Sequence, residues 1–357
     1  MSRILIAPDS FKGSATSIEV ASAIAKGWRS RRPNDDLIQI PFADGGEGSL
    51  LTIEFAQPTA QRIYCPEVSP DAYWLLLDGS TAVVELAQVC GITLLPKLDP
   101  MGAHTFALGQ VLAHAARDER VKRIYCALGG SASSDAGVGA LMALGAKFYD
   151  SAGNSIGLGG EQLAHIASIS TDLMIAPPKD GVKLLVDVNS PLLGAHGAAA
   201  TFSPQKGATQ QQVHILENAL AHFASKTGVL DSPGCGAAGG SSYGLHALWG
   251  ARIENGAAKI SDLCGIDAVI SSVDLVITGE GRLDSQSFQG KVVGHLTQLA
   301  ATAHVPIAYC VGTLDGDFPA HSLGGVSLTQ IAGSYVSAKS DPEKYLCEAG
   351  VQLTSLL

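Results

Sequence analysis

The sequence predicts an α/β protein of two domains built on parallel sheets. Its 357 residues exceed the roughly 250–300 residues at which one hydrophobic core usually stops growing. Hydrophobic residues make up 46% of the chain and charged residues only 16%, which excludes a disordered polypeptide. A unit in which a short apolar run leads into a loop rich in Gly, Ser and Asp, usually followed by helical periodicity, recurs along the chain. This alternation of strands and helices is typical of α/β proteins.

Six apolar runs predict the buried strands of parallel sheets. They lack the polar alternation of a strand with one face in water, so both faces are expected to be covered. In sheets of this kind, ligands bind beyond the carboxyl ends of the strands. The loops that follow the runs are therefore the candidate site. The runs span residues 4–7, 37–42, 123–126, 184–186, 275–277 and 307–311.

Helical patterns fill several intervals between these runs. Thr16-Ser17-Ile18-Glu19 predicts a capping box at a helix N-terminus, and apolar residues at helical spacing continue to Trp28. Two further apolar stripes run from Val213 to Phe223 and from Leu296 to Ala303, and Pro306 ends the second. Helices at these places would supply the crossovers that parallel strands require.

The segment from about Arg62 to Val89 differs from the rest and indicates a second domain. Residues 73–85 predict a β-hairpin turned by Asp78-Gly79. If the first two runs pair with the closing runs, the first domain is discontinuous. We expect it to comprise residues 1–60 and 262–357, interrupted by an inserted domain of residues 61–261. The active site is expected in the cleft between them.

The charge balance excludes some classes of partner. Lys and Arg total 23 and Asp and Glu total 33, a net charge of -10, which opposes binding to nucleic acid or to an anionic membrane. Seven scattered cysteines predict reduced core thiols, not a disulfide framework or a metal site. The first residues lack the apolar stretch of a signal peptide, so a cytoplasmic protein is expected. The oligomeric state stays open.

The loop Gly129-Gly130-Ser131 is the strongest candidate for binding phosphate. A buried strand precedes it, and a helix is predicted from Ala136 to Ala146, so backbone N–H groups would converge at a helix N-terminus. The alternative is a tight turn in which Ser134 or Asp135 is the N-cap, and a cap and a cradle are compatible. The P-loop pattern GxxxxGK[ST] is missing from the sequence.

A GxGxxG pattern at Gly234, Gly236 and Gly239 is weak evidence for a dinucleotide site. It follows Asp231-Ser232-Pro233, whereas the dinucleotide fingerprint follows a buried strand. Together with Gly240, these glycines are instead a candidate for a second anion cradle at the start of a helix.

Acidic and basic residues accumulate in the loops after the strands. A single acidic residue there is usually a cap or a turn former, but several at one sheet edge would repel each other unless a cation lay among them, and Mg²⁺ binds carboxylates together with phosphate oxygens. Carboxylates, cations and amide cradles in one place favour phosphoryl transfer. The acidic residues are Asp9, Asp44, Glu47, Asp187, Glu280 and Asp284, and the loop cations are Lys12, Lys206, Arg282 and Lys291.

Five loops carry distinctive motifs: Ala7 to Lys12 (APDSFK), Ala43 to Gly48 (ADGGEG), Gly129 to Ala132 (GGSA), Phe202 to Ala208 (FSPQKGA) and Thr278 to Gln286 (TGEGRLDSQ). In this order they resemble the motifs of the type I glycerate kinase family. The resemblance extends from residue 4 to about residue 312, and its first, second and last motifs are very specific.

The resemblance implies a kinase that uses ATP and Mg²⁺ to phosphorylate D-glycerate, with 2-phosphoglycerate favoured over 3-phosphoglycerate as the product. It also implies a Rossmann-like parallel-sheet domain interrupted by a second α/β domain of unusual topology. This fold agrees with the discontinuous first domain expected from the strand pattern.

The residues and the resemblance together assign roles as hypotheses. Asp187 is the first choice as acceptor of the substrate hydroxyl proton and Asp44 the second, while Lys12 and Arg282 would meet the carboxylate of glycerate. Ser10, Gly45, Gly46, Glu47 and Gln286 would complete the substrate site. Mg²⁺ would be held by Asp187, Glu280 and Asp284. ATP would be bound by Gly129, Gly130, Ser131, Asp135, Gln205, Lys206, Lys291 and the second cradle of Gly236, Gly239 and Gly240.

Two other classes of function remain as alternatives. An NAD-dependent oxidoreductase would use the glycines from Gly234 to Gly239. A non-catalytic binder of small acids would also suit two α/β domains, but it would not need the clusters of acidic loops.

Overall fold

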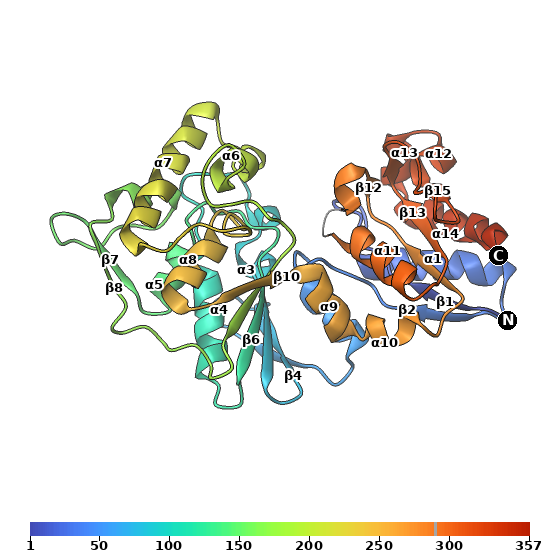
Figure 1. The fold of residues 1–357 in the computed structure, drawn as a ribbon, viewed down its shortest axis with the longest axis horizontal. Helices are drawn as coiled ribbons and strands as arrows, with labels where there is room; N and C mark the ends of the chain where they lie inside the picture. The colour runs from blue at the N-terminus through green and yellow to red at the C-terminus, as the bar shows by residue number, and fades with distance from the viewer. Residues whose placement is uncertain (289–290) are drawn as a thin grey trace. The chain divides into compact units, whose positions relative to one another are not determined.

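The computed structural model describes residues 1–288 and 291–357, without the side chain of Gln286. The chain forms two compact units (Figure 1). Unit 1 comprises Met1–Asp44, Leu51–Pro58 and Ala257–Leu357, and unit 2 comprises Gly45–Leu50 and Thr59–Gly256. Within the described residues, no helix is long and apolar enough to cross a membrane.

Unit 1 is built on a five-stranded sheet in the order β15-β13-β11-β1-β2. All neighbouring strands are parallel, with Ile4 of β1 beside both Leu275 of β11 and Leu37 of β2. Four of the predicted apolar runs therefore form one parallel sheet. The strands are β1 (Arg3–Ile6), β2 (Asp36–Gln39), β11 (Leu275–Thr278), β13 (Ile307–Val311) and β15 (Gly325–Ser327), and β12 (Arg282–Leu283) pairs separately with β14 (Thr313–Leu314).

Helices surround this sheet and share its core. The side chains of Ile4, Ile6 and Ile277 pack with Ile24 and Trp28 of α1 in one buried cluster. The helices are α1 (Ser17–Arg31), α9 (Gly256–Cys264), α10 (Ile266–Ile270), α11 (Val292–Thr302), α12 (Leu328–Ala332), α13 (Tyr335–Ser340) and α14 (Pro342–Leu353), with 3-10 turns at Ser285–Phe288 and Thr354–Leu356. Helix α2 (Ser49–Ala56) begins in unit 2 and continues in unit 1.

Helix α1 begins with the predicted capping box. The Thr16 side chain accepts a hydrogen bond from Glu19 N, and the Glu19 carboxylate accepts one from Thr16 N. The helix then packs closely against α14: a Cβ at Gly27 would lie 1.9 Å from the carbonyl oxygen of Cys347. The absence of a side chain at Gly27 is therefore a condition for this packing.

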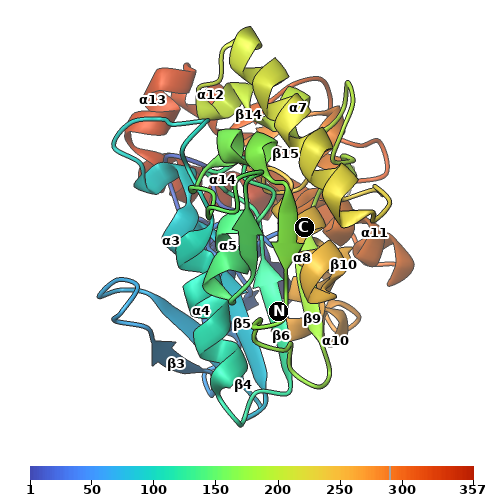
Figure 2. The ribbon, with the colours of Figure 1, turned by 90° about the vertical axis from the view of Figure 1, so that its left-hand side faces the viewer.

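Unit 2 is built on a mixed six-stranded sheet in the order β10-β9-β6-β5-β4-β3 (Figure 2). Strands β5, β6, β9 and β10 are parallel, while β3, β4 and β5 are antiparallel. The predicted hairpin is β4 and β5, with Leu77 opposite Thr81, and Asp78 and Gly79 of its three-residue connection have φ of +50° and +61°. The strands are β3 (Gln61–Tyr64), β4 (Tyr73–Leu77), β5 (Thr81–Glu85), β6 (Arg123–Ala127), β9 (Val182–Val186) and β10 (Arg252–Asn255), with a separate pair, β7 (Lys147–Tyr149) and β8 (Ser168–Ser170).

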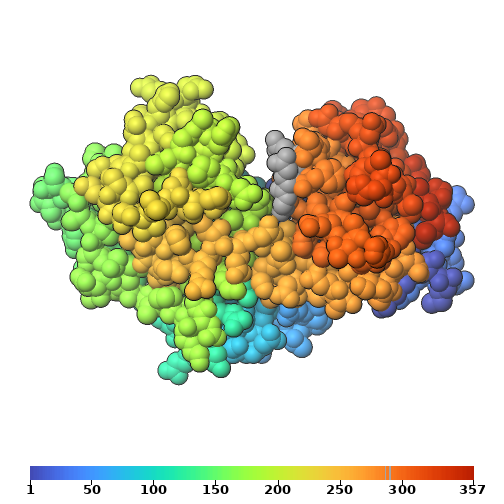
Figure 3. Space-filling model, viewed as in Figure 1, coloured from blue at the N-terminus to red at the C-terminus, as the bar shows by residue number. Residues whose placement is uncertain are grey.

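The helices of unit 2 enclose the larger hydrophobic core, which includes Trp74, Phe223 and Tyr243. Helix α7 buries Leu216 and Leu220, while its other face forms part of the outer surface (Figure 3). The helices are α3 (Ala87–Cys90), α4 (Phe106–Arg117), α5 (Val138–Ala143), α6 (Ala198–Phe202), α7 (Gln210–Thr227) and α8 (Ser241–Trp249), with 3-10 turns at Ile92–Leu94, Gly160–His165 and Pro204–Lys206. All seven cysteines of the chain are free and six are buried, as predicted.

We expect Gly27→Ala to destabilise the protein by about 1–3 kcal/mol, the usual cost of forcing atoms into a filled interior. The intrinsic helix propensity of alanine acts in the opposite direction, so a loss of stability would come from the contact with Cys347. Urea unfolding measures the change. Ser22→Ala, at an exposed position of the same helix, is the control and should change stability by less than about 0.5 kcal/mol. Equal stability of Gly27→Ala and wild type would contradict the packing.

Candidate active site

The strand order of the unit 1 sheet reverses between β1 and β11. Its strands follow the order 2-1-3-4-5 along the chain, so the connections from β1 and β11 lead to opposite sides of the sheet. Ligands of open α/β sheets bind where the order reverses, beyond the carboxyl ends of these two strands. The loops after β1 and β11 meet there, because Asp9 N donates to the carbonyl oxygen of Gly279 at 2.8 Å.

A cavity of about 540 Å³ lies at this position within unit 1. It is lined by the loop after β1, the loop after β11, and residues between Leu328 and Pro342. The structure brings seven predicted site residues together here: Ser10, Lys12, Asp44, Glu280, Arg282, Asp284 and Lys291.

Three carboxylates in this cavity are electrostatically coupled. Burial raises the pKa of Asp9 to about 8, the charge of Asp44 adds to this rise, Lys12 opposes it, and Glu280 contributes further to the rise. Burial also raises the pKa of Glu280. The Oε1 atom of Glu280 is buried and has no hydrogen-bond partner among the described residues. Oxygen donors arranged in this way suit a hard divalent cation such as Mg²⁺.

The cations of the cavity are more exposed to solvent than its acids. Arg282 is exposed and donates to the Asp315 carboxylate at 2.8 Å. An exposed ion pair of this kind contributes little stability, so an anionic ligand could replace Asp315 at small cost. Lys12 is exposed, and Lys291 precedes α11 and lowers the pKa of Glu280. The side chain of Gln286 lies outside the described residues.

In unit 2, two predicted loops lie directly against each other. Gly129 N donates to the carbonyl oxygen of Gly45 at 3.0 Å, and a Cβ at Gly129 would lie 2.5 Å from Gly46 Cα. Glu47 is exposed beside them. Gly130 is also exposed, and within the described residues neither its N–H nor that of Ser131 has an internal acceptor. These two N–H groups are available to an anion.

Lys206 lies beneath the loop of Gly129 to Ser131. Its ammonium donates to Ser131 Oγ at 3.0 Å and to the carbonyl oxygen of Ser133. The residue is almost fully buried, and burial lowers the pKa of its side chain to about 7, while the charge of Asp135 opposes the shift. The structure therefore connects two of the predicted loops through a buried cation. The neighbouring Gln205 is exposed.

Asp135, which is predicted to bind ATP, has internal partners. Its carboxylate is buried and accepts hydrogen bonds from Thr105 N and Oγ1, both at 2.8 Å, and from the N–H groups of Gly137 and Gly139. The helix predicted from Ala136 is α5, which begins at Val138 and has six residues. Its N-cap is Gly137, without a side-chain cap hydrogen bond, so neither Ser134 nor Asp135 is the N-cap. The carboxylate therefore stabilises the turn before α5, and a contact of Asp135 with ATP stays a prediction.

The second glycine-rich loop uses its glycines for internal packing. A Cβ at Gly236 would lie 2.2 Å from the carbonyl oxygen of Pro191, and one at Gly239 would lie 2.1 Å from that of Ser133. The N–H groups of Gly236 and Gly240 already donate to backbone carbonyls. Because these two donors are occupied, we assign no phosphate to the N–H groups of Gly236 and Gly240, and a contact of Gly239 with phosphate stays a prediction.

Asp187 follows the last residue of β9 and is half-buried. Strand β9 is parallel to β6, with Leu185 beside Ala127. A Cβ at Gly45 would lie 3.2 Å from Leu185. The chain after β9 therefore leaves the same sheet edge as the loops of Gly45 and Gly129.

The sequence pattern alone predicts no specific role for two acids of these loops. Asp9 is predicted only as an acid at a strand end, and the structure places it, half-buried, in the unit 1 cluster. Glu85, the last residue of β5, follows the same strand-end pattern and is buried. Its carboxylate accepts hydrogen bonds from Gly48 N and Leu50 N.

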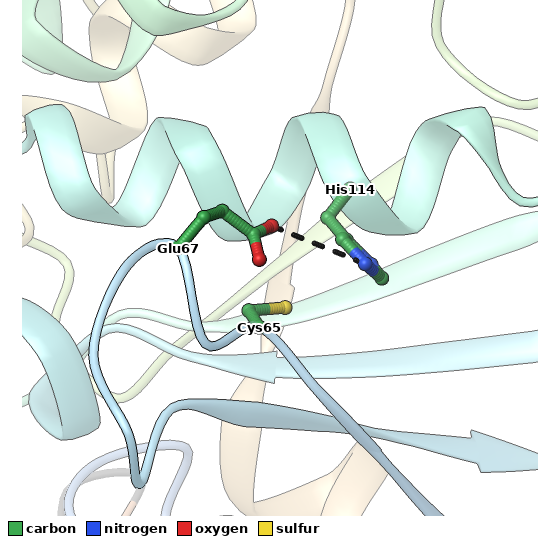
Figure 4. A group of neighbouring side chains, drawn as sticks. All are labelled: Cys65, Glu67 and His114. Carbon is green, nitrogen blue, oxygen red and sulfur yellow. Dashed lines mark ion pairs between the residues drawn. The ribbon is translucent and has the colours of Figure 1, made fainter.

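A further group of possible metal ligands in unit 2 is Cys65, Glu67 and His114, whose ligand atoms lie within 4.8 Å of one another (Figure 4). Trp74 Nε1 donates to His114 Nδ1 at 3.0 Å, so in the neutral ring the proton resides on Nε2, the atom 4.0 Å from Glu67. Binding a metal through Nε2 would require that proton to leave. Burial also raises the pKa of the Cys65 thiol to about 12.

The fold and the site define an α/β enzyme that handles phosphate. Unit 1 combines acidic and cationic side chains at the point where its strand order reverses. Unit 2 has a glycine loop that is held by a buried lysine, Lys206. These are the elements of an enzyme that transfers a phosphoryl group.

Comparison with known proteins specifies the class. Residues 4–357 match the model of the glycerate kinase family. The chain is 37% identical over 330 residues to the glycerate 2-kinase of Escherichia coli K12, covering 88% of this chain and 86% of that protein. It is 36% identical over 330 residues to the glycerate kinase of Bacillus subtilis 168, with coverage of 88% and 86%. A solved structure from Salmonella typhimurium LT2, whose description names glycerate kinase 2, matches with a TM-score of 0.74 and 31% identity over 99% of this chain and 98% of that one.

The chain belongs to the glycerate kinase family. It is a kinase with an alcohol group as acceptor, and ATP use follows from that class. The resemblance inferred from the motifs and the α/β fold class are confirmed. The alternatives of an oxidoreductase and of a non-catalytic binder receive no support from these relatives.

We expect the stability of wild type relative to Lys206→Met to rise with pH between about 7 and 10. In this range the unfolded chain keeps the lysine proton, which the folded protein has lost because burial lowers the pKa. The unfolded state then binds more protons, and stability increases with pH. Urea unfolding of both proteins across this range measures the difference. Lys179→Met, which removes an exposed lysine of the same unit, is the control. A difference independent of pH would contradict a buried Lys206.

Proposed function

We propose that the protein phosphorylates D-glycerate with ATP and that the product is 2-phosphoglycerate. The observation that carries the proposal is the cavity of unit 1, in which four acids and four cations line about 540 Å³, a size suited to a small hydroxy acid. The relatives named glycerate kinase support the substrate class, and the Escherichia coli relative named glycerate 2-kinase supports the position of transfer.

In this proposal, the cavity of unit 1 holds glycerate. Lys12 and Arg282 bind the substrate carboxylate, because a guanidinium and an ammonium offer charge-assisted hydrogen bonds. Arg282 exchanges its exposed partner Asp315 for the substrate. Ser10, in the same loop as Lys12, also lines the cavity.

The N–H groups of Gly130 and Ser131 bind phosphate oxygens of ATP in this proposal. Lys206 stabilises that loop by hydrogen bonds to Ser131 and Ser133. Glu280 and Asp284 are the residues of unit 1 that would hold Mg²⁺, and Asp187 is the residue of unit 2 with the same chemistry. The ion would neutralise charge on the phosphates.

Asp187 accepts the proton of the substrate hydroxyl in this proposal, and Asp44 is the second choice. A carboxylate that accepts this proton raises the nucleophilicity of the oxygen as it attacks the terminal phosphorus.

The proposed function is tested by ³¹P NMR of the product formed from D-glycerate, ATP and Mg²⁺. We expect the resonance of 2-phosphoglycerate together with that of ADP. A product with the resonance of 3-phosphoglycerate would contradict the position of transfer. Absence of any phosphoglycerate, with ATP intact, would contradict the activity itself.

We expect Asp187→Asn to lower kcat by at least about 10²-fold, as loss of a general base usually does. Steady-state kinetics at increasing Mg²⁺ separate two roles: excess Mg²⁺ would restore activity if Asp187 only bound the metal. Asp180→Asn is the control in the same unit, because Asp180 forms only a partly exposed ion pair with Arg123. Unchanged turnover of Asp187→Asn would eliminate the assignment and leave Asp44 to be tested.

A further inference from the structure

Glu85 is a buried carboxylate whose partners are backbone atoms. It is the last residue of β5 and only 6% exposed. Its Oε1 accepts a hydrogen bond from Gly48 N and its Oε2 accepts one from Leu50 N, both at 2.9 Å. Both oxygens therefore bind one short segment that precedes Glu85 by more than thirty residues.

The segment held by Glu85 is Gly45–Leu50. It belongs to unit 2, although Asp44 before it and Leu51 after it belong to unit 1. At its other end, the carbonyl oxygen of Gly45 accepts the N–H of Gly129. Glu85 and Gly129 thus hold the two ends of the segment, and Gly46 and Glu47 lie between these anchors.

Helix geometry explains why this position suits a carboxylate. Gly48 and Leu50 flank the start of α2, where the first N–H groups of a helix have no acceptor within the helix. A carboxylate satisfies two such groups at once, and negative charge at a helix N-terminus is favourable. A glutamine would offer only one oxygen, and its NH₂ group would face the other N–H donor.

Burying the charge of Glu85 is costly, and this cost indicates that its contact with Gly45–Leu50 has a specific effect. Burial raises the pKa of Glu85 to about 7, the amide hydrogen bonds of Leu50 and Gly48 oppose the rise, and the charge of Glu47 adds to it. An apolar residue at the end of β5 would avoid the cost of burying a charge. What the charge provides is a fixed conformation of Gly45–Leu50.

We propose that Glu85 is a positioning residue for phosphoryl transfer. Its carboxylate fixes the Gly45–Gly48 loop against Gly129 and Gly130, and so sets the place of Glu47 and of the loop backbone in the reaction. The proposal rests on the proposed function. Displacing a positioning group by about 1 Å can cost on the order of 10² in rate.

The test compares Glu85→Gln and Glu85→Asp with wild type. We expect Glu85→Gln to lower kcat by about 10- to 100-fold and to leave the Kd of ATP, measured by calorimetry, within about threefold, because Gly130 and Ser131 keep their own anchors, the hydrogen bond from Ile92 N to the Gly130 carbonyl and that from Lys206 to Ser131 Oγ. Glu85→Asp retains the charge and should recover part of kcat. A merely structural role would change ATP binding and turnover together.

Glu254→Gln is the matched control. Glu254 lies on β10 of the same sheet and pairs with Lys183 at 2.8 Å. The same chemical change there should alter kcat by less than about twofold. Wild-type kcat in Glu85→Gln would overturn the proposal.

A second measurement does not depend on activity. Hydrogen exchange of residues 45–50 should be faster in Glu85→Gln than in wild type, and unchanged exchange would overturn the anchor. If the variants do not fold, the wild-type amide resonances of Gly48 and Leu50 should titrate together with Glu85, and absence of a common titration would overturn it. If wild type makes no phosphoglycerate, the proposed function fails, whereas these measurements still decide whether Glu85 holds the segment.

Discussion

The contact between the backbones of Gly46 and Gly129 is the constraint on which the loops of unit 2 depend. No Cβ fits at Gly129, because it would lie 2.5 Å from Gly46 Cα. Side chains can rotate away from a close contact, whereas two backbones cannot, so the two loops have one relative position. Polar atoms of segments packed in this way must find partners in the interior. Buried charged side chains provide those partners in this unit.

The charged side chains of the two units have different partners. In unit 2, Glu85, Asp135 and Lys206 direct their charged atoms at backbone or hydroxyl groups of the loops. The hydrogen bonds that they make offset the cost of burying these charges. In unit 1, the acids Asp9 and Glu280 lie in a cavity, and Glu280 retains a buried oxygen without a hydrogen-bond partner in the described part of the chain. The charge of unit 1 is thus available to a ligand.

Particular residues show what could be predicted from the sequence. The run Ile307 to Val311 is fully buried, and the absence of polar alternation was sufficient to recognise it. The strand-end rule found Asp44, Glu280 and Asp284, because parallel strands end at one edge. Asp135 is not among these acids: its predicted contact with ATP comes from its place after the Gly129-Gly130-Ser131 loop, and the sequence does not show that Thr105, thirty residues earlier, supplies two of its donors. The pattern of Gly236 to Gly240 likewise does not reveal whether a glycine faces a ligand or another backbone, and Gly239 faces Ser133.

The charge balance of the unit 1 cavity bears on how an anionic substrate could bind there. Four carboxylates, those of Asp9, Asp44, Glu280 and Asp284, line it with the cations Lys12, Arg282, Lys291 and Lys339. Because burial raises the pKa of Asp9 to about 8, that carboxyl is mostly protonated near neutral pH, and four cations then face three carboxylates. A hydroxy acid adds one negative charge, which balances these side chains, and Arg282 can contact it by leaving Asp315 in solvent at little cost. A phosphate brings further negative charge, which the four side-chain cations cannot offset alone, and this is the electrostatic reason why a kinase that uses this cavity would need a divalent cation.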